Sequence, residues 1–245
     1  VQDLFMTPTA KYADVFLPAS CYAEKEGTFT NSERRVQRVR KAVDTPGEAR
    51  VDWTIIADIA KAMGMTEQFH WRTSSEVFDE IAKVTPSYRG MSFARIDKDG
   101  LQWPCPTPEH PGTKFLHKDI FARGKAKFMP ATYKEPKEMP NEKYPYILNT
   151  GRNLYHYNIT TRYSTRLNDI RPGELMEINA VDADKLGLKE YDCVRVTSRR
   201  GSIRSRITIT DKVQPGQTFM SLHFKESPVN ELTSEHMDPI TMTGE

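Results

Sequence analysis

The pattern of apolar and polar residues divides the chain into a mixed α/β stretch, an irregular stretch and a mostly β stretch. Residues 1–5 (VQDLF) predict a strand that runs into a loop. Residues 13–19 (ADVFLPA) form a short apolar run closed by Pro18, which is typical of a buried strand. The next run, EKEGTFTNSERRVQ, is dense in charges and hydroxyls, and we expect it to be a polar loop.

Two helices are predicted in the remainder of the α/β stretch. The first begins at Asp52, whose side chain suits the capping of a helix start, and ends at Gly64. Its apolar stripe consists of Ile55, Ile56, Ile59, Ala60 and Met63. The second begins near Ser75 and stops at Thr85-Pro86, because the residue before a proline disfavours helical angles. Its apolar face consists of Val77, Phe78, Ile81 and Ala82.

Prolines and glycines crowd the span from Gly100 to Pro145, among lysines and aromatic residues. Such a segment is extended and irregular, and it is typical of a connection between domains that runs over a surface. We therefore expect three parts: an α/β region at 1–97, an irregular connector at 98–145 and a β domain at 146–245.

The β domain is predicted from short runs that mostly alternate apolar with polar residues. They are YILNT, LMEI, CVRVTS, SIRSRITIT and TFMSLHF. The turns between them are supplied by Pro172-Gly173, Arg200-Gly201 and Pro215-Gly216. One helix, capped by Asn179 and ended by Gly187, interrupts the strands. Its inward-facing residues are Val181, Ala183 and Leu186. Strands at this spacing with hairpin turns favour a small closed barrel.

Composition narrows the class of protein without defining a function. Apolar residues make up 38% of the chain and charged residues 28%, which is ordinary for a globular protein. A formal net charge of +2 does not indicate a polyanion partner, and no apolar run approaches the roughly eighteen residues of a membrane span. Cys21, Cys105 and Cys193 lie too far apart for a disulfide framework or a metal-ligand set, and they favour a reducing, cytoplasmic compartment.

The segment NTGRNLYHYNITTRYSTR is the strongest candidate for a binding site. Glycine directly after a strand permits close backbone approach, and hydroxyls, amides and guanidinium forks suit phosphate and polar ring atoms. Its polar residues are Arg152, His156, Asn158, Thr160, Thr161 and Arg162. The alternative is a solvated loop whose tyrosines pack locally. No carboxylate pair, serine–histidine set or metal-ligating pair accompanies it, so the residues predict a binding module without a catalytic centre.

Nucleic-acid binding is disfavoured despite the arginines in RRVQRVRK and along the later strands. Arg195, Arg204 and Arg206 alternate along strands, which is the usual pattern of a solvated sheet face. Acidic residues balance the basic ones across the chain, whereas a nucleic-acid surface needs an excess of positive charge.

Long motifs in this chain resemble the molybdopterin oxidoreductases, the dimethyl-sulfoxide-reductase superfamily. QDLFMTPTAKYADVFLPASCYAEKEGTFTNSERRVQRVRKAV resembles a stretch near the middle of these enzymes. TGRNLYHYN, the later strands and VNELTSEHMDPIT resemble their carboxy-terminal dinucleotide-binding domain. Within the superfamily, GLQWPCP, HPGTKFLH and RGKAKF are similar to formate dehydrogenase catalytic subunits. Nitrate reductases share the first and last motifs.

The resemblance implies part of a larger Rossmann-like α/β domain followed by a six-stranded double-psi β-barrel. It also implies bis-molybdopterin guanine dinucleotide carrying molybdenum or tungsten, with formate oxidation releasing a proton and two electrons. The family's selenocysteine or cysteine ligand and its iron–sulfur cysteines do not map to this chain. We therefore expect no catalytic residue and no metal ligand here, and we expect the chain to be a piece of a longer or split polypeptide. The implied partners are the amino-terminal catalytic part of the subunit and iron–sulfur electron-transfer subunits, with a hydrogenase or another redox module beyond them.

The resemblance also assigns binding roles residue by residue. Asp3, Thr7 and Lys25 are implied to lie beside one guanine dinucleotide. Asp52 matches an aspartate that pairs with the guanine edge, whose N1–H and exocyclic amine are adjacent donors, and this role competes with the helix cap. The segment that wraps the other pterin matches Thr150, Gly151, Arg152, Asn153, Leu154, Tyr155, His156, Tyr157 and Asn158, with Arg152 and His156 as expected donors. Asn230 matches a pterin-contacting asparagine, and Leu222 stands where the family has an aromatic residue.

Two alternatives remain open at this point. A nitrate reductase or another member of the superfamily would share most of these motifs. A non-catalytic scaffold in an electron-transfer complex would keep the barrel without the cofactor.

Overall fold

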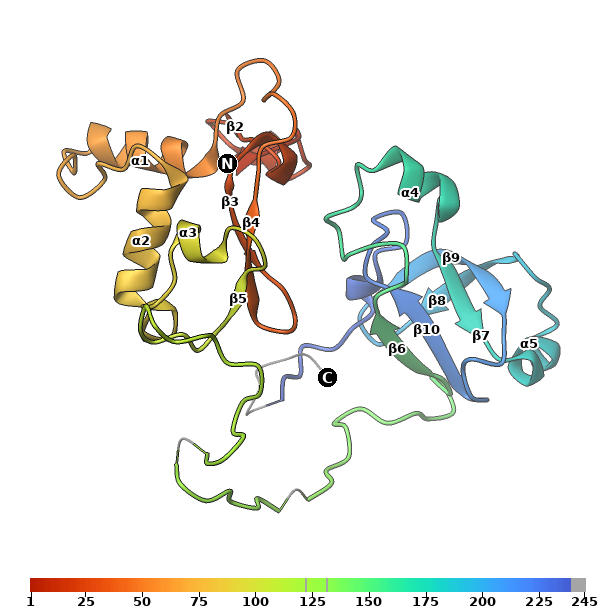
Figure 1. The fold of residues 1–245 in the computed structure, drawn as a ribbon. Coiled ribbons are helices and arrows are strands. Elements are labelled where there is room, and N and C mark those ends of the chain that lie inside the picture. The colour runs from red at the N-terminus through yellow and green to blue at the C-terminus, as the bar shows by residue number, and fades with distance from the viewer. Residues whose placement is uncertain (122, 131, 239–245) are drawn as a thin grey trace. The chain divides into compact units, whose positions relative to one another are not determined.

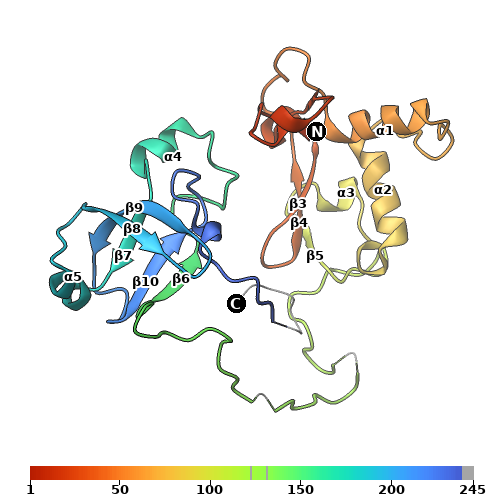
Figure 2. The same cartoon turned by 180° about the vertical axis from the view of Figure 1, so that it is seen from behind.

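The computed structural model describes residues 1–121, 123–130 and 132–238, and the chain forms two compact units, Val1–Phe128 and Met129–Glu245 (Figures 1 and 2). The last residues of VNELTSEHMDPIT, from Pro239 on, lie outside the described residues.

The first unit opens with a short parallel pair of strands, β1 (Gln2–Asp3) and β2 (Leu17–Pro18). The predicted first strand is confirmed, but the prediction of a buried strand over 13–19 is wrong for most of that run. Val15 is 61% exposed, and burial begins only at Ala19. β2 is only two residues long, and its hydrogen bonds to β1 join the strand edges without burying the side chains above and below, so Leu17 is partly exposed and Pro18 exposed.

The predicted polar loop is instead a hairpin. β3 (Gly27–Thr30) pairs antiparallel with β4 (Arg35–Val39), and β4 pairs with β5 (Leu101–Gln102). Val36 is fully buried at the centre of β4. Arg38 lies on the same face, with a side chain only 12% exposed and its guanidinium 3.9 Å from the centre of the Phe93 ring. The charged run is therefore a sheet that buries part of its charge against the core, and not a loop.

The helices of the first unit are α1 (Asp52–Ala62), α2 (Ser74–Val84) and α3 (Phe93–Ile96). The second predicted helix is confirmed, and Phe78 and Ala82 are buried as expected. For α1, the prediction that one apolar stripe is buried holds for only part of that stripe. Ile55 and Ala60 are buried, but three members of the predicted stripe are about half exposed or more: Ile56, Ile59 and Met63. Within this unit α1 is covered on one side only.

The core of the first unit lies between α2, α3 and the β3–β4–β5 sheet, as Figure 1 shows. It consists of Val36, Phe78, Met91, Phe93, Ile96 and Cys105, with Tyr88, Leu101 and Trp103 packed against it. Residues from the amino-terminal end of the predicted connector are thus part of a hydrophobic core.

Two arginines hold this proline-rich stretch in place by donating to backbone carbonyls. Arg34 donates to the carbonyls of Trp103 and Thr113. Arg95 donates to the carbonyl of His110 at 2.8 Å and lies 3.3 Å from the Cys105 sulfur. The structure therefore extends the first unit past residue 97 to Phe128, because apolar anchors and guanidinium donors order a segment whose composition indicates a loop. No helix or strand of three residues or more is formed by the described residues between Gln102 and Ile147.

The second unit is built on a five-stranded mixed sheet with the order β6-β10-β7-β9-β8. Its strands are β6 (Ile147–Gly151), β7 (Leu175–Ile178), β8 (Cys193–Thr197), β9 (Ser202–Ile209) and β10 (Gln217–Ser221). All five predicted strands are confirmed. β6 is parallel to β10 and β7 is parallel to β9, while β10–β7 and β8–β9 are antiparallel. This sheet has no sixth strand among the described residues, so the closed six-stranded barrel stays a prediction.

Helices α4 (Thr165–Ile170) and α5 (Ala180–Leu186) connect the strands. Asn179 caps α5 by accepting from the backbone N of Val181 at 3.0 Å, and Gly187 ends it in the left-handed conformation, as predicted. The predicted inward face is wrong for Val181 and Leu186, which are 50% and 52% exposed. The helix is too short to bury a full stripe, and it packs through Ala183 and Asp182 instead.

The three cysteines provide a test of these two units. Cys105 is fully buried, Cys193 is exposed and Cys21 is intermediate. We expect iodoacetamide to label Cys193 under native conditions while Cys105 stays unlabelled until urea unfolds the first unit. Peptide mass spectrometry measures both sites in one sample, so Cys193 serves as the internal control. Equal native labelling of the two thiols would contradict the core described for residues 101–105.

Candidate cofactor-binding site

The candidate loop begins where two parallel strands of the second unit end side by side. Thr150 and Gly151 of β6 lie opposite Met220 and Ser221 of β10. The backbone N of Leu222 then donates to the carbonyl of Gly151 at 2.9 Å, which continues the pairing past the strand. The pairing therefore places Leu222 next to the start of the loop, as the predicted site requires.

The absence of a side chain at Gly151 matters for packing within the unit, because the Phe219 ring lies against this position. A Cβ at this position would lie 3.0 Å from Cε2 of Phe219 on the neighbouring strand. That distance is tighter than nine in ten Cβ contacts in proteins, so a side chain here would require the Phe219 ring to shift by a few tenths of an ångström. The glycine brings β6 close to that ring.

Arg152 is exposed, and two neighbours hold its guanidinium. Its Nε donates to Oδ1 of Asn158 at 2.8 Å, and its Cζ lies 4.9 Å from the centre of the Tyr157 ring. Among the described residues no hydrogen-bond partner occurs for its two terminal nitrogens. The hydrogen bond from Nε thus orients the guanidinium of Arg152 and leaves its two terminal nitrogens to donate elsewhere.

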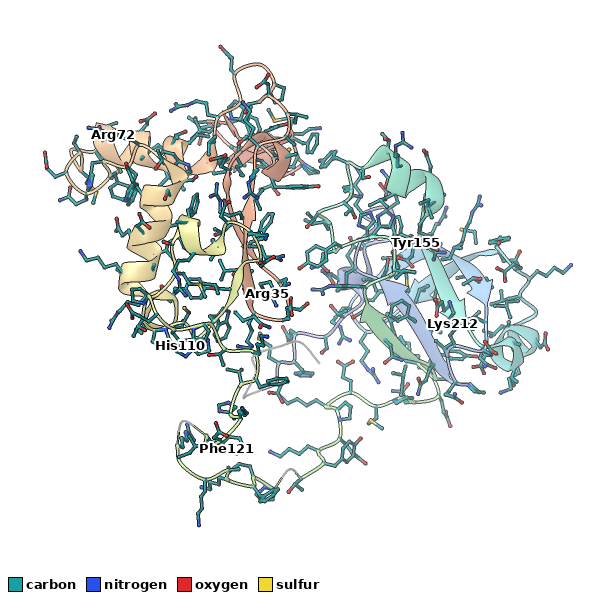
Figure 3. The ribbon with its side chains drawn as sticks, in the orientation of Figure 1. Arg35, Arg72, His110, Phe121, Tyr155 and Lys212 are labelled. Atoms are coloured by element: carbon teal, nitrogen blue, oxygen red, sulfur yellow. The ribbon has the colours of Figure 1, made fainter. Side chains whose placement is uncertain are left out.

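Asn153 shapes the loop through its side-chain oxygen. Oδ1 accepts from the backbone N of Tyr155 at 3.0 Å and of His156 at 2.9 Å. Its Nδ2 is buried without a partner among the described residues. Leu154, Tyr155 and Tyr157 are 89%, 45% and 59% exposed, so the apolar surface of this loop faces outward. Figure 3 labels Tyr155 in this loop.

His156 is only 3% exposed, and both of its ring nitrogens have partners within the unit. Nδ1 lies 3.1 Å from Oγ1 of Thr161, and Nε2 lies 3.0 Å from the carbonyl oxygen of Arg171. A carbonyl only accepts, so Nε2 carries the hydrogen and Nδ1 accepts from the threonine hydroxyl. Both nitrogens therefore serve the loop itself in this structure, and a hydrogen bond from His156 to a cofactor stays a prediction.

His223 is a residue of this region that sequence reasoning missed. Its ring stacks on His156 with centroids 3.8 Å apart and planes at 8°, and Phe224 contacts both rings edge-on. Its Nδ1 donates to the carbonyl of Asn158. Burial lowers the pKa of His223 below its usual value, and the neighbouring His156 and Arg162 lower it further. The only sequence signal was its place next to Leu222 at the end of a strand.

A buried carboxylate lies under the ends of the same strands. Glu174 is 7% exposed, and its Oε2 accepts from the backbone N and the hydroxyl of Ser221. Burial raises the pKa of Glu174 above its usual value, although the Ser221 hydrogen bonds and Arg171 act in the opposite direction. Nε of Arg171 is buried without a partner among the described residues.

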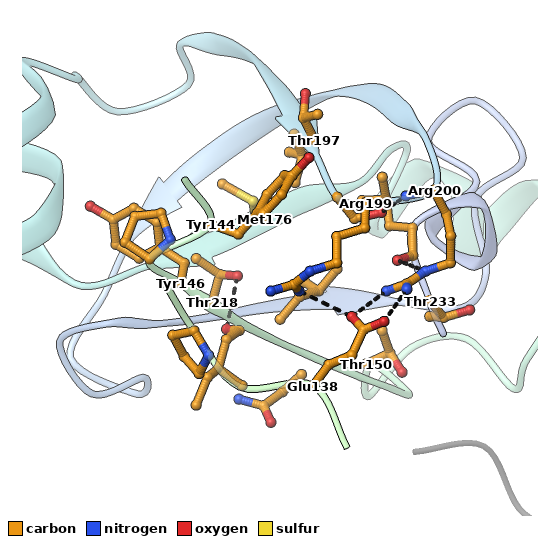
Figure 4. A pocket seen from close by; sticks show the side chains of 18 of the residues that line it. Glu138, Tyr144, Tyr146, Thr150, Met176, Thr197, Arg199, Arg200, Thr218 and Thr233 are labelled. Atoms are coloured by element: carbon orange, nitrogen blue, oxygen red, sulfur yellow. Dashed lines mark hydrogen bonds and ion pairs between the residues drawn. The ribbon is translucent and has the colours of Figure 1, made fainter. Parts of the chain in front are cut away.

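A cavity of about 920 Å³ is lined by residues 147–150 of β6 together with residues of β7, β8 and β10, and Figure 4 shows it from close by. Its wall includes both edge strands of the sheet, β6 and β8, which indicates that the sheet curves around it. Apolar residues of the wall are Leu148, Met176, Ile178, Leu188, Val194, Val196 and Leu232. Thr150 and Asn230 also line it, whereas Gly151–Asn158 and Leu222 do not. The predicted barrel residues therefore fall into two neighbouring groups that meet at the end of β6.

An ionic clamp that the sequence did not predict lies in the wall of this cavity. Glu138 lies on the segment before β6, and Arg199 and Arg200 lie in the β8–β9 turn (Figure 4). The Glu138 carboxylate accepts hydrogen bonds from a terminal nitrogen of Arg199, at 3.1 Å, and from both terminal nitrogens of Arg200. The hydrogen bond from Arg200 is the main reason that the pKa of Glu138 falls to about 2. Arg199 also lies 5.0 Å from the centre of the Tyr144 ring.

In the first unit, Lys25 and Asp52 are brought together and Asp3 and Thr7 serve local turns. Lys25 pairs with Oδ2 of Asp52 and donates to the carbonyl of Ser20 at 2.9 Å. Oδ1 of Asp3 accepts from the backbone N of Leu4 at 2.7 Å. Oγ1 of Thr7 accepts from the backbone N of Ala10 at 3.2 Å, at the start of a short helical turn.

Asp52 does not cap α1 as predicted. The cap position is Val51, and Asp52 is the first residue of the helix, where a negative charge is favourable. Its carboxylate is used by Lys25 and by Nε2 of Gln2 at 3.0 Å. Burial raises the pKa of Asp52, but these two hydrogen bonds outweigh it and hold the pKa below its usual value. Nearby, the hydroxyl of Ser20 is buried without a partner among the described residues.

Two further findings concern the described residues as a whole. No helix among them is both long and apolar enough to cross a bilayer. Nor do they contain a cluster of three or more histidine, cysteine, aspartate or glutamate side chains arranged to hold a metal ion.

Comparison with known families matches both ends of the chain to proteins that hold a molybdopterin. Residues 146–245 match the model of the molydopterin dinucleotide binding domain, and residues 1–62 match that of molybdopterin oxidoreductase. The chain is therefore similar to the molybdopterin oxidoreductases in both of these ranges. The resemblance predicted from its motifs is confirmed.

Two curated relatives show how the similarity is distributed. The chain is 52% identical over its whole length to the F420-dependent formate dehydrogenase 2 subunit alpha of Methanococcus maripaludis, of which it covers 37%. It is 37% identical over 97% of its length to the assimilatory nitrate reductase catalytic subunit of Bacillus subtilis, of which it covers 35%. The chain thus spans about a third of the length of the curated relatives it matches.

A solved structure supports the fold. Acetylene hydratase from Pelobacter acetylenicus matches 98% of this chain with a TM-score of 0.66 at 22% identity, and the chain covers 34% of that protein. At this identity the likeness concerns the fold alone.

The buried Glu174 gives a pH-dependent prediction. A carboxyl whose pKa is raised in the folded state contributes stability below its unfolded pKa and loses it as pH rises through the folded pKa. We therefore expect Glu174→Gln to raise the melting temperature at pH 7.5 and to give no gain near pH 4. Glu177→Gln, three residues further along and on β7, is the matched control and should give no such pH dependence. A Glu174→Gln protein that is less stable at pH 7.5 would contradict this account.

Proposed function

We propose that the chain is the carboxy-terminal part of a formate dehydrogenase catalytic subunit, where it holds bis-molybdopterin guanine dinucleotide beside the metal site. The similarity to a formate dehydrogenase alpha subunit, at 52% identity against 37% for a nitrate reductase, supports the formate assignment. The observation that carries the binding role is the loop after β6. Its donors are oriented but unused, and it lies within the residues that match the dinucleotide-binding family.

The donors of this loop fit the chemistry of the cofactor. A pyrophosphate and a pterin ring offer acceptors, and charge-assisted hydrogen bonds from a guanidinium to phosphate are among the strong ones. Arg152 has its Nε fixed by Asn158 and its terminal nitrogens unpaired among the described residues. Nδ2 of Asn153 is a buried donor without a partner, a state that costs free energy until an acceptor is supplied.

His156 has a supporting role in this proposal. With both ring nitrogens used by Thr161 and Arg171, it fixes the loop conformation, and Arg152 is the main donor. Leu222 and the exposed tyrosines supply apolar surface beside it. Thr150 and Asn230 line the neighbouring cavity and would contact the pterin from there.

In the first unit we propose that Asp52 accepts the guanine edge of the other dinucleotide. Each carboxylate oxygen already receives one hydrogen bond, from Gln2 and from Lys25, and each retains a second lone pair for the adjacent guanine donors. Lys25 keeps the carboxylate ionised, because its hydrogen bond helps to hold the pKa of Asp52 low. Asp3 and Thr7 lie on the same amino-terminal segment and would border the nucleotide.

The proposal includes a double-psi barrel for the second unit and a fragment of a Rossmann-like domain for the first. The mixed sheet of the second unit, with two parallel pairs joined by an antiparallel one, supports five strands of a double-psi barrel. The cavity between its edge strands would then be the barrel interior. In the first unit, the parallel β1–β2 pair followed by α1 supports a fragment of a Rossmann-like domain.

The bound cofactor would supply a molybdenum or tungsten centre that accepts two electrons from formate. This chain's residues bind and orient it, and the metal ligand and the iron–sulfur cysteines belong to an upstream part of the subunit. Iron–sulfur subunits would carry the electrons onward, with F420 as the acceptor suggested by the relative's name and a hydrogenase or another redox module as a further partner. The three free thiols support a cytoplasmic enzyme.

Arg152→Ala tests the binding role. In the assembled enzyme we expect roughly tenfold faster loss of the pterin dinucleotide, because a charge-assisted hydrogen bond is removed and tenfold corresponds to about 1.4 kcal/mol. Retention is measured by the fluorescence of the oxidised pterin released per subunit. Arg166→Ala, an exposed arginine on α4, is the control.

Unchanged retention in Arg152→Ala would overturn the binding role of the loop. Assays of the wild-type enzyme with formate and with nitrate separate the two substrate classes. Turnover of nitrate alone would overturn the formate assignment and leave the binding role in place.

Asp52→Asn tests the guanine contact. An amide presents an N–H₂ where guanine requires an acceptor, so we expect the variant to lose cofactor roughly tenfold faster or more. Asp58→Asn is the matched control, because Asp58 lies on the same helix and pairs with Arg50 at the surface. If both variants lower the melting temperature and neither loses cofactor, Asp52 serves only the ion pair with Lys25.

A further inference from the structure

We propose that His223 is a positioning residue for the cofactor site: it fixes Asn158, and through Asn158 it orients Arg152. The inference rests on the proposed function of the loop after β6 and assigns a role to a residue outside it. The connection consists of two hydrogen bonds, from His223 to the Asn158 carbonyl and from Arg152 to the Asn158 side chain.

Asn158 is the pivot of this connection because its backbone is in the left-handed region, with φ of +48°. L residues seldom adopt that region, although asparagine does so more readily than most, so contacts that hold the conformation matter. The hydrogen bond from Nδ1 of His223 to the Asn158 carbonyl holds it. In this conformation Oδ1 of Asn158 reaches Nε of Arg152 at 2.8 Å.

His223 is itself held rigidly, so it can act as a fixed reference point. It is 4% exposed and lies at the end of β10, on an element different from the loop. One face is covered by the His156 ring at 3.8 Å, and the Phe224 ring meets it edge-on at 4.7 Å. His156 is locked in turn by Thr161 and by the Arg171 carbonyl. The stacked rings of His223, which follows β10, and His156, in the loop, therefore fix the position of the loop relative to the sheet.

Packing alone does not account for an imidazole at this position. A phenyl ring would fill a similar space and stack on His156 without burying polar nitrogens. What the imidazole adds is the Nδ1–H that the Asn158 carbonyl accepts. The charged groups that face it are Arg162 and Glu226, which pair with each other at 3.3 Å. Burial, His156 and Arg162 lower the pKa of His223, so the ring stays neutral at pH 7 and donates as described.

Two substitutions in the assembled holoenzyme separate the hydrogen bond from the packing. His223→Phe keeps the stacked ring and removes the donor, whereas His223→Asn removes the ring and places an amide N–H near the position of Nδ1. We expect His223→Phe to release the cofactor roughly tenfold faster, and His223→Asn to stay within about threefold of wild type. The melting temperature should show the opposite order, since the asparagine variant loses the buried ring. Cofactor loss that follows the melting temperature would overturn the proposal.

A double-mutant cycle tests whether His223 acts through Arg152. If it does, adding His223→Phe to Arg152→Ala should not accelerate cofactor release further, because the side chain that His223 orients is already gone. Multiplied effects would overturn the proposal while leaving Arg152 as a cofactor ligand. If Arg152→Ala by itself leaves retention unchanged, the proposed function of the loop fails, and the positioning role fails with it.

Discussion

The parallel pairing of β6 with β10 is the constraint on which the second unit depends. It places the ends of two strands at one edge of the sheet, so that Gly151 and Leu222 adjoin although 70 residues of chain lie between them. The loop that carries Arg152 and the segment that carries His223 both leave the sheet from this edge. Parallel strands require a long crossover, and here the crossover contains β7, β8, β9 and both helices. Any displacement of β10 would therefore move the loop and its support together.

Much of the second unit could be predicted from the sequence because its signals are local. Several of the five strands alternate apolar with polar residues, and Asn179 and Gly187 mark the ends of α5 by their capping chemistry. Thr150 to Asn158 could be singled out because a glycine and several polar groups follow a strand directly. His223 could not, because its partner Asn158 lies 65 residues away and nothing local shows the pairing. Nor could the sequence show that both nitrogens of His156 are used within the fold.

The errors in the first unit have a common physical origin. The arginines on either side of Val36 concealed strand β4, in which Val36 is completely buried and Arg38 packs over the Phe93 ring of the core. Prolines after Gly100 indicated a surface connection, yet Trp103 and Cys105 enter the core and Arg34 and Arg95 satisfy the carbonyls around them. In both places the many charged residues or prolines suggested an exposed segment, whereas a few apolar side chains pack into or against the core and bury part of that segment. The half-exposed stripe of α1 is the reverse case, in which a helical pattern exceeds what this unit can cover.

The clamp between Glu138 and the two arginines of the β8–β9 turn has a consequence for solution conditions. With a pKa of about 2, Glu138 stays ionised across the physiological range, so acidity within that range does not open the clamp. The three side chains are partly exposed, and attraction between such charges is screened over a Debye length of about 8 Å at physiological ionic strength. These contacts are shorter than that length, and they weaken only at much higher ionic strength, where the Debye length falls to about 3 Å at 1 M salt. Concentrated salt, and not acidity within the physiological range, is therefore the condition expected to loosen the segment preceding β6.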